Sequence, residues 1–125
     1  MIKHQRLLFA FFVLGSFLFP SFSEGSLEDI KTAVLQEDFA KVKTLAKEAL
    51  ATESLGAERE RILYYLALSQ LYAGEENEAR GNFQRLVDST KDMDLYDQSC
   101  IGVINSYYLT AHYREALKRA HQLLE

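Results

Sequence analysis

Apolar residues between positions 26 and 125 return at a fixed interval of 37. The matching sets are Val42, Ala79 and Ala116; Ala46, Phe83 and Ala120; Ala49, Leu86 and Leu123; and Leu50, Val87 and Leu124. Lys, Glu, Asp, Arg and Gln occupy most of the positions between them. A fixed period of roughly 20–50 residues, with the apolar positions in register, indicates a stack of repeated structural units.

Within each unit the apolar residues lie three and four positions apart, as on one face of an α-helix. No stretch alternates strictly between apolar and polar residues as a half-buried strand would, and the only proline is Pro20. The pattern predicts six helices, at 26–36, 38–55, 57–73, 76–89, 94–110 and 113–125. Ser26 and Asp94 are the expected N-caps of the first and fifth helices, Gly56 breaks the second and Gly74 ends the third.

Ser99, Gly102 and Ser106 lie three and four residues apart in the predicted helix 94–110. Residues at this spacing are neighbours on a helix surface, so their small side chains form a slim face that another helix can approach closely. The predicted helix 57–73 is instead apolar around most of its circumference. We expect it to be sandwiched between neighbouring helices.

Residues 1–23 differ from the rest of the chain. A short basic start, with Lys3 and Arg6, precedes an almost unbroken apolar run of 13 residues from Leu7 to Phe19, and small residues stand at Ser21 and Ser23. This is the pattern of a secretory signal peptide, with cleavage expected after Ser23 and export to the periplasm or the cell exterior. The alternative is an uncleaved membrane anchor, but the apolar run is shorter than the roughly 20 residues that a spanning helix needs.

Removal of the leader leaves twelve Lys and Arg against all 18 Asp and Glu. An acidic chain without a basic stripe argues against nucleic acid and anionic membranes as partners, and a membrane contact is expected only if the leader is uncleaved. Exported proteins often contain disulfides, but Cys100 is the single cysteine. We expect it to be buried and inert, with an intermolecular link as the alternative.

The middle unit carries the clearest motif. Its elements are Leu66-Ala67 on the first helix, Gly74 at the turn, Glu78-Ala79 at the start of the second helix, and then Phe83 and Leu86. This arrangement resembles the tetratricopeptide repeat (TPR). The resemblance implies an all-α fold, an α-solenoid of three helix-turn-helix repeats at about 26–52, 57–90 and 94–125, in a domain of residues 24–125 behind the signal peptide.

The chain departs from the family pattern in three respects. Ile30 and Ile104 stand where a small residue is usual, Glu37 and Ala111 replace the turn glycine, and the period is 37 rather than roughly 34. Longer repeats of this kind are similar to those of bacterial cell-envelope proteins, such as the coordinator proteins of the Tol-Pal system and the repeat lipoprotein of the outer-membrane barrel-assembly machine.

In the TPR family the first helices line a concave surface that binds segments of partner proteins. The resemblance therefore implies a groove lined by Arg61, Tyr64, Tyr65, Leu68 and Tyr72 of the second unit and by Gln98, Asn105 and Tyr108 of the third. Tyrosine and arginine are the residues that most often anchor protein interfaces. The alternative is that some of these tyrosines are core residues of a thin solenoid.

Nothing in the sequence predicts catalysis. There is no HExxH, CxxC or glycine-rich phosphate loop, and no nucleophile elbow positions a serine. His112 and His121 are nine residues apart, so they point to opposite sides of a helix rather than toward one metal ion. We expect no catalytic residue, no metal and no cofactor.

The function that these features predict is an exported protein–protein interaction scaffold with a protein or peptide partner. A membrane-tethered envelope assembly factor with an uncleaved leader, and an enzyme or metal protein with an unrecognised site, are the alternatives. The last predicted helix has no polar capping helix after it, so Leu117 and Leu124 are expected to be partly exposed. Such a patch indicates either a protein contact, including self-association through the last helix, or a truncated sequence.

Overall fold

The computed structural model of the protein describes residues 23–52 and 55–125, which form an all-α fold without a strand. The helices are α2 (Ser23–Leu35), α3 (Phe39–Leu50), α4 (Arg59–Tyr72), α5 (Glu76–Ser89), α6 (Met93–Leu109) and α7 (Tyr113–Leu124), and a 3-10 turn (Gly56–Glu58) precedes α4. Residues 1–22 of the predicted signal peptide lie outside the described residues, and the predicted cleavage point after Ser23 falls at the first residue of α2. In the described part, no helix is long and apolar enough to cross a membrane.

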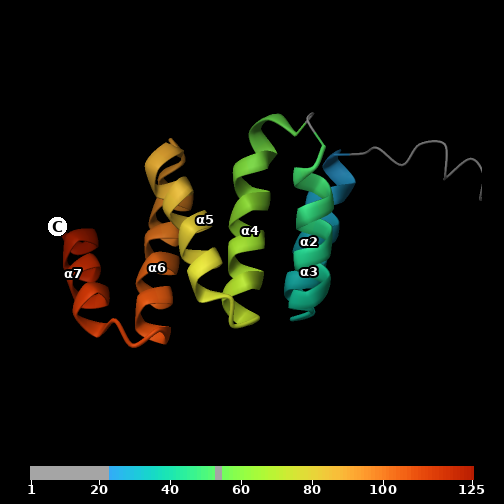
Figure 1. Ribbon diagram of the computed structural model, residues 1–125. Helices are drawn as coiled ribbons and strands as arrows, with labels where there is room; N and C mark the ends of the chain where they lie inside the picture. Colours follow the sequence, from blue (N-terminus) through green and yellow to red (C-terminus); the bar gives the residue numbers. More distant parts are fainter. Residues whose placement is uncertain (1–22, 53–54) are drawn as a thin grey trace, which may run out of the picture.

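The helices stand side by side, and consecutive helices run in opposite directions (Figure 1). Each helix packs against the next one in the sequence, and α4 also contacts α2 and α6. The first helix of the middle pair, α4, therefore contacts the first helices of both neighbouring pairs. This arrangement brings residues of α4 and α6 onto a common surface.

The three turns within the helix pairs have the same backbone geometry. Their left-handed residues are Glu37, Gly74 and Ala111, with φ angles of 56°, 80° and 62°. The next residue in each turn donates its N–H to a carbonyl five positions earlier: Asp38 to Ala33 (3.0 Å), Glu75 to Gln70 (2.9 Å) and His112 to Tyr107 (2.8 Å). This is the Schellman motif that ends helices, and it recurs every 37 residues although only one of the three turns contains glycine.

The second helix ends earlier than the sequence predicts. It ends at Leu50, not just before Gly56. The backbone N–H and the hydroxyl of Thr52 both donate to the carbonyl of Ala49, which ends the helical hydrogen bonding. Leu55, which precedes the 3-10 turn, is only 5% exposed and belongs to the first core cluster. Burial of one leucine outside the helix therefore overrides the continuous helical pattern.

Two predicted N-caps are also wrong. The carboxylate of Asp92, rather than that of Asp94, caps α6 by accepting the N–H of Leu95 at 3.2 Å. Asp92 is itself positioned by its N–H, which donates to the hydroxyl of Thr90. Ser26 lies within α2, which begins three residues earlier. Both sites offer more than one residue of a capping type, Ser23 and Ser26 at the first and Asp92 and Asp94 at the second.

Two clusters of apolar side chains form the core. The first joins α2, α3 and α4 through Ile30, Val42, Ala46 and Ile62, all fully buried. The second joins α4, α5 and α6 through Ala67, Ala79, Phe83 and Val103. Since α4 contributes to both clusters, the prediction that this helix is sandwiched is confirmed.

The slim face of α6 packs against α5. Ser99, Gly102 and Ser106 are all buried there, as predicted. A Cβ atom added to Gly102 would lie 2.7 Å from three ring atoms of Phe83, far inside van der Waals contact. On its other side the Phe83 ring meets the edge of the Tyr64 ring, with centroids 5.7 Å apart. Phe83 is thus confined between α4 and the backbone of α6.

Arg80 joins α5 to the last turn of α6. Its guanidinium donates to the hydroxyls of Ser106 (2.9 Å) and Thr110 (2.7 Å) and lies 4.0 Å from the centroid of the Tyr107 ring. Hydrogen bonds from a charged donor and a cation–π contact are among the stronger polar interactions in proteins. They hold the carboxyl end of α6 against α5.

We predict that Gly102→Ala lowers the free energy of unfolding by about 1–3 kcal/mol, because the new methyl group overpacks the Phe83 ring. The matched control is Gly81→Ala in α5, where nothing lies within 4 Å of an added Cβ. That variant should gain about 0.5–1 kcal/mol, because alanine loses less entropy than glycine in a helix. Urea unfolding measures both, and equal stability of the two variants would show that Phe83 does not constrain α6.

The left-handed turns give a second prediction. Ala111→Gly should raise the free energy of unfolding by about 0.5–1 kcal/mol, since an L-residue at positive φ is strained and glycine is not. Ala40→Gly, the same change on the right-handed backbone of α3, should lower it. Thermal unfolding of the two variants tests whether the backbone at Ala111 is left-handed. A lower melting temperature for Ala111→Gly than for Ala40→Gly would contradict the prediction.

Candidate partner-binding site

A hollow of about 280 Å³ lies between the carboxyl-terminal halves of α4 and α6. Its lining residues are Leu68, Leu71 and Tyr72 of α4 and Asn105, Tyr108 and Leu109 of α6. In both helices these residues are at spacings of three and one, and the second set is the first shifted by 37. The hollow is therefore built from equivalent positions of two successive helix pairs.

Another aromatic ring supports each of the two tyrosines in this lining. Tyr72 stacks on Phe39 of α3, with ring centroids 4.0 Å apart and planes 4° apart. Tyr108 meets Tyr113 of α7 edge-on at 5.3 Å. Both tyrosines still expose large surfaces, 66% for Tyr72 and 61% for Tyr108. The two rings are thus held in place and remain available for contact.

Four of the eight groove residues predicted from the sequence line this hollow, namely Leu68, Tyr72, Asn105 and Tyr108. Leu71 and Leu109 are lining residues that the prediction omits. The 37-residue repeat identifies both omitted residues. Leu71 is the equivalent of the predicted residue Tyr108, and Leu109 is the equivalent of the predicted residue Tyr72.

The other four predicted residues lie elsewhere. Tyr64 packs against the second core cluster and Tyr65 against the first. Burial raises the pKa of Tyr64, with the neighbouring Tyr65 and Tyr72 adding to the effect. Arg61 forms an ion pair with Asp92 (2.9 Å) at the opposite end of α4, and Gln98 is exposed on the first half of α6.

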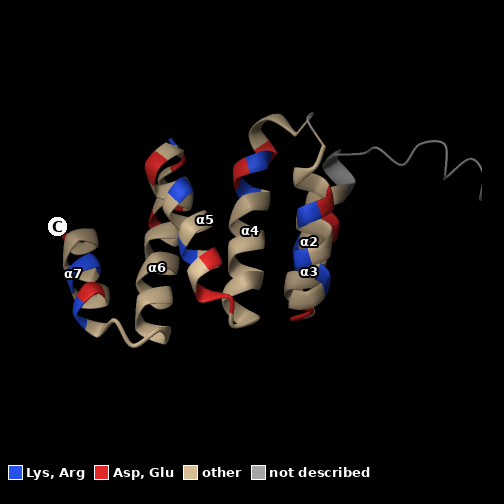
Figure 2. Ribbon diagram, viewed as in Figure 1, with Lys and Arg blue, Asp and Glu red and all other residues tan. Residues whose placement is uncertain are grey.

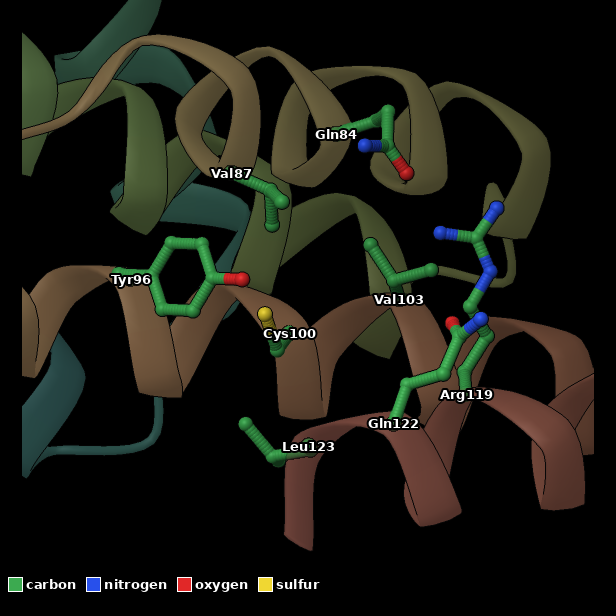
Figure 3. A pocket seen from close by; sticks show the side chains of 8 residues that line it. All are labelled: Gln84, Val87, Tyr96, Cys100, Val103, Arg119, Gln122 and Leu123. Carbon is green, nitrogen blue, oxygen red and sulfur yellow. The ribbon is translucent and has the colours of Figure 1, made fainter. Parts of the chain in front are cut away.

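A smaller cavity of about 90 Å³ lies between α5, α6 and α7 (Figure 3). It is lined by Gln84, Val87, Tyr96, Cys100, Val103, Arg119, Gln122 and Leu123. Small-molecule sites usually enclose roughly 300–1,000 Å³, so this space is too small for most ligands. It also contains the chain's single cysteine.

The environment of Cys100 does not favour the reactive thiolate. Burial raises the pKa of the Cys100 thiol, and the effect of Asp97 has the same direction. A hydrogen bond with Tyr96 lowers it, but by less than burial raises it. In Figure 3 the Tyr96 hydroxyl points toward the sulfur atom. Because only the thiolate is a good nucleophile, this thiol is suited to packing rather than chemistry.

A third hollow, of about 510 Å³, lies at the opposite end of α4. Leu50, Arg59, Glu60, Leu63, Leu66, Asn82, Arg85, Leu86 and Ser89 line it. Two of its lining residues, Leu50 and Arg59, flank the link that contains residues 53–54, which lie outside the described part of the chain. The hollow between α4 and α6 is accordingly the better-defined candidate.

The outer face of α7 is apolar and exposed, with Tyr113, Leu117 and Leu124 all more than half exposed. The exposure predicted for Leu117 and Leu124 is therefore confirmed. The self-association expected through this helix stays a prediction.

We predict that iodoacetamide alkylates Cys100 with a pH midpoint above that of a cysteine in a short peptide, because burial disfavours the thiolate. Tyr96→Phe should move the midpoint further up, since it removes the hydrogen bond that lowers the pKa. Protein unfolded in guanidinium is the control and should react like the peptide. A midpoint at or below that of the peptide in the folded protein would contradict the prediction.

Comparisons with known proteins identify no relative. The sequence matches no protein-family model, no curated protein and no solved structure. Among residues 23–52 and 55–125, no three His, Cys, Asp or Glu side chains are grouped so that they could hold a metal ion. The chemistry of the site therefore rests on the hollow's own lining, which consists of leucines, two supported tyrosines and one amide.

Proposed function

We propose that this protein is an exported interaction scaffold that holds a segment of a partner protein in the hollow between α4 and α6. It carries out no catalysis of its own. The basic start and apolar run of residues 1–19 support export to the periplasm or the cell exterior. The partner is a protein or peptide rather than a nucleic acid, since the surface is acidic.

In this proposal the three helix pairs form a TPR-like α-solenoid. The Schellman turn that recurs every 37 residues supports it, as do the contacts of α4 with both α2 and α6. In such an array each pair contacts mainly its neighbours, and the surface made by the first helices is continuous from pair to pair. The hollow lies on that surface.

The observation that carries the proposal is the pair of exposed tyrosines that other aromatic rings hold in place. A binding site loses affinity when its side chains must be immobilised on binding, and supported rings avoid much of that cost. Tyrosine also gives a large rigid contact area with a polar tip, as interface anchors do. An exposed contiguous apolar patch on a protein surface often marks an interaction site.

The lining indicates how a segment binds. A hollow of about 280 Å³ is below the range of roughly 300–1,000 Å³ typical of pockets for whole small ligands, so it suits one large apolar side chain. Asn105 is exposed at its edge and offers both a donor and an acceptor. One amide can therefore pair with one peptide group of the bound segment while the apolar side chain fills the hollow.

We predict that Tyr72→Ala weakens partner binding by about 1–2 kcal/mol, because it removes a rigid wall of the hollow. The immobilised protein first captures partners from an envelope extract, and the captured partner is then titrated against each variant. Leu124→Ala is the matched control, since it removes an apolar side chain that is exposed outside the hollow. It should leave the affinity unchanged.

Tyr64→Ala separates recognition from packing. Tyr64 contacts Phe83 in the core, so this variant should lower the melting temperature more than Tyr72→Ala does. Equal losses of affinity and melting temperature in Tyr72→Ala would show that Tyr72 acts through stability. An unchanged affinity in that variant would exclude the hollow as the binding site.

A further inference from the structure

The hollow lies near the end of α4, where the following turn and the start of α5 contain Glu75 and Glu76. Tyr72 and Leu109 are the last residues of α4 and α6, so the turns that follow these helices border it. Glu37 and Asp38 directly precede Phe39, the residue that stacks on Tyr72. In Figure 2 acidic residues mark the starts of α3 and α5, whereas the adjoining halves of α4 and α6 carry no charge.

Two of the four basic residues near these acids have partners. Lys43 forms an ion pair with Glu75, and Arg80 donates hydrogen bonds to Ser106 and Thr110, whose neutral hydroxyls leave its positive charge in place. Within the described residues, no ion pair involves Glu37, Glu76 or Glu78. Two further basic residues, Lys41 and Arg114, are exposed in this region. Arg114 follows Tyr113 and so lies on the α7 side of the hollow.

Helix capping explains only some of the acidic residues. Glu76 and Glu78 are in the first turn of α5, where a negative charge interacts favourably with the helix dipole. Glu37 precedes the capping residue Asp38 and has a left-handed backbone, with φ of 56°. Glycine would fit that backbone with less strain, so neither helix capping nor turn geometry accounts for a glutamate there.

We infer that the segment bound in the hollow carries lysine or arginine next to a large apolar side chain. The inference rests on the proposed function and adds the chemistry of the partner. The hollow itself has no charged lining residue, so the side chain that enters it is neutral. The acidic surface beside Tyr72 attracts the adjoining basic residues, which raises the association rate and selects against acidic segments.

Four fluorescein-labelled nine-residue peptides test the inference by fluorescence anisotropy with the purified protein. Three have Leu-Phe at the centre and differ in the flanking residues, which are lysines, serines or glutamates. The fourth has lysine flanks around Ala-Ala. We expect the Leu-Phe peptide with lysines to bind at least tenfold more tightly than the one with glutamates, with serines between, and its affinity to fall as salt is raised.

A pair of double variants tests whether Glu37 and Glu76 cause the preference for lysine-flanked peptides. Glu37→Gln with Glu76→Gln should remove most of the difference between the lysine and serine peptides and leave the serine peptide's affinity unchanged. Glu48→Gln with Asp94→Asn makes the same change of charge at exposed positions elsewhere and should preserve the difference. Melting temperatures show whether each variant is folded.

The possible results are distinguishable. If the serine, lysine and glutamate peptides bind equally, and Tyr72→Ala weakens all three, the inference is overturned and the proposed function stands. Equal binding of the Ala-Ala and Leu-Phe lysine peptides, or a preference for glutamates, also overturns the inference. If no peptide binds, or Tyr72→Ala changes no affinity, the proposed function fails and the inference fails with it.

Discussion

The ring of Phe83 must fit between α4 and α6, and it fits because residue 102 has no side chain. The ring lies against the backbone of α6 at Gly102 and against Tyr64 of α4. A larger residue at position 102 would push α6 outward from α5. Since α4 and α6 enclose the hollow, their separation at Phe83 helps to set the distance between Tyr72 and Tyr108. Packing in the second core cluster thus determines the geometry of the surface above it.

The hollow gains its rigidity from outside the two helices that line it. Phe39 of α3 supports Tyr72, and Tyr113 of α7 supports Tyr108. Arg80 of α5 holds the last turn of α6 through Ser106, Thr110 and the Tyr107 ring. All three helix pairs therefore contribute to a site that only two of them form. A single helix pair would leave these side chains mobile, and the ordering cost would then fall on binding.

The helices and the slim face can be predicted from the sequence because they depend on local spacing. The helix at 76–89 is predicted to the residue, since a glycine turn precedes it and its apolar period stops at Val87. The end of α3 cannot be predicted in this way, because it depends on the burial of Leu55 by distant helices. Only part of the site can be predicted, because the exposure of each side chain also depends on distant helices. Tyr64, Tyr65 and Tyr72 are chemically alike and share one helix, and only the positions of α3, α5 and α6 decide which of them is exposed.

The equivalent positions of the first unit differ in polarity from the positions that line the hollow. Leu68, Leu71 and Tyr72 correspond to Asn105, Tyr108 and Leu109 and, in the first unit, to Lys31, Val34 and Leu35. Lys31 pairs with Glu28 on its own helix, so α2 presents a charged residue where the other two units have a leucine and an amide. On this side Tyr72 is already covered by Phe39, which leaves its opposite face for a ligand. The apolar surface therefore begins at Tyr72 and continues through Tyr108 toward Tyr113.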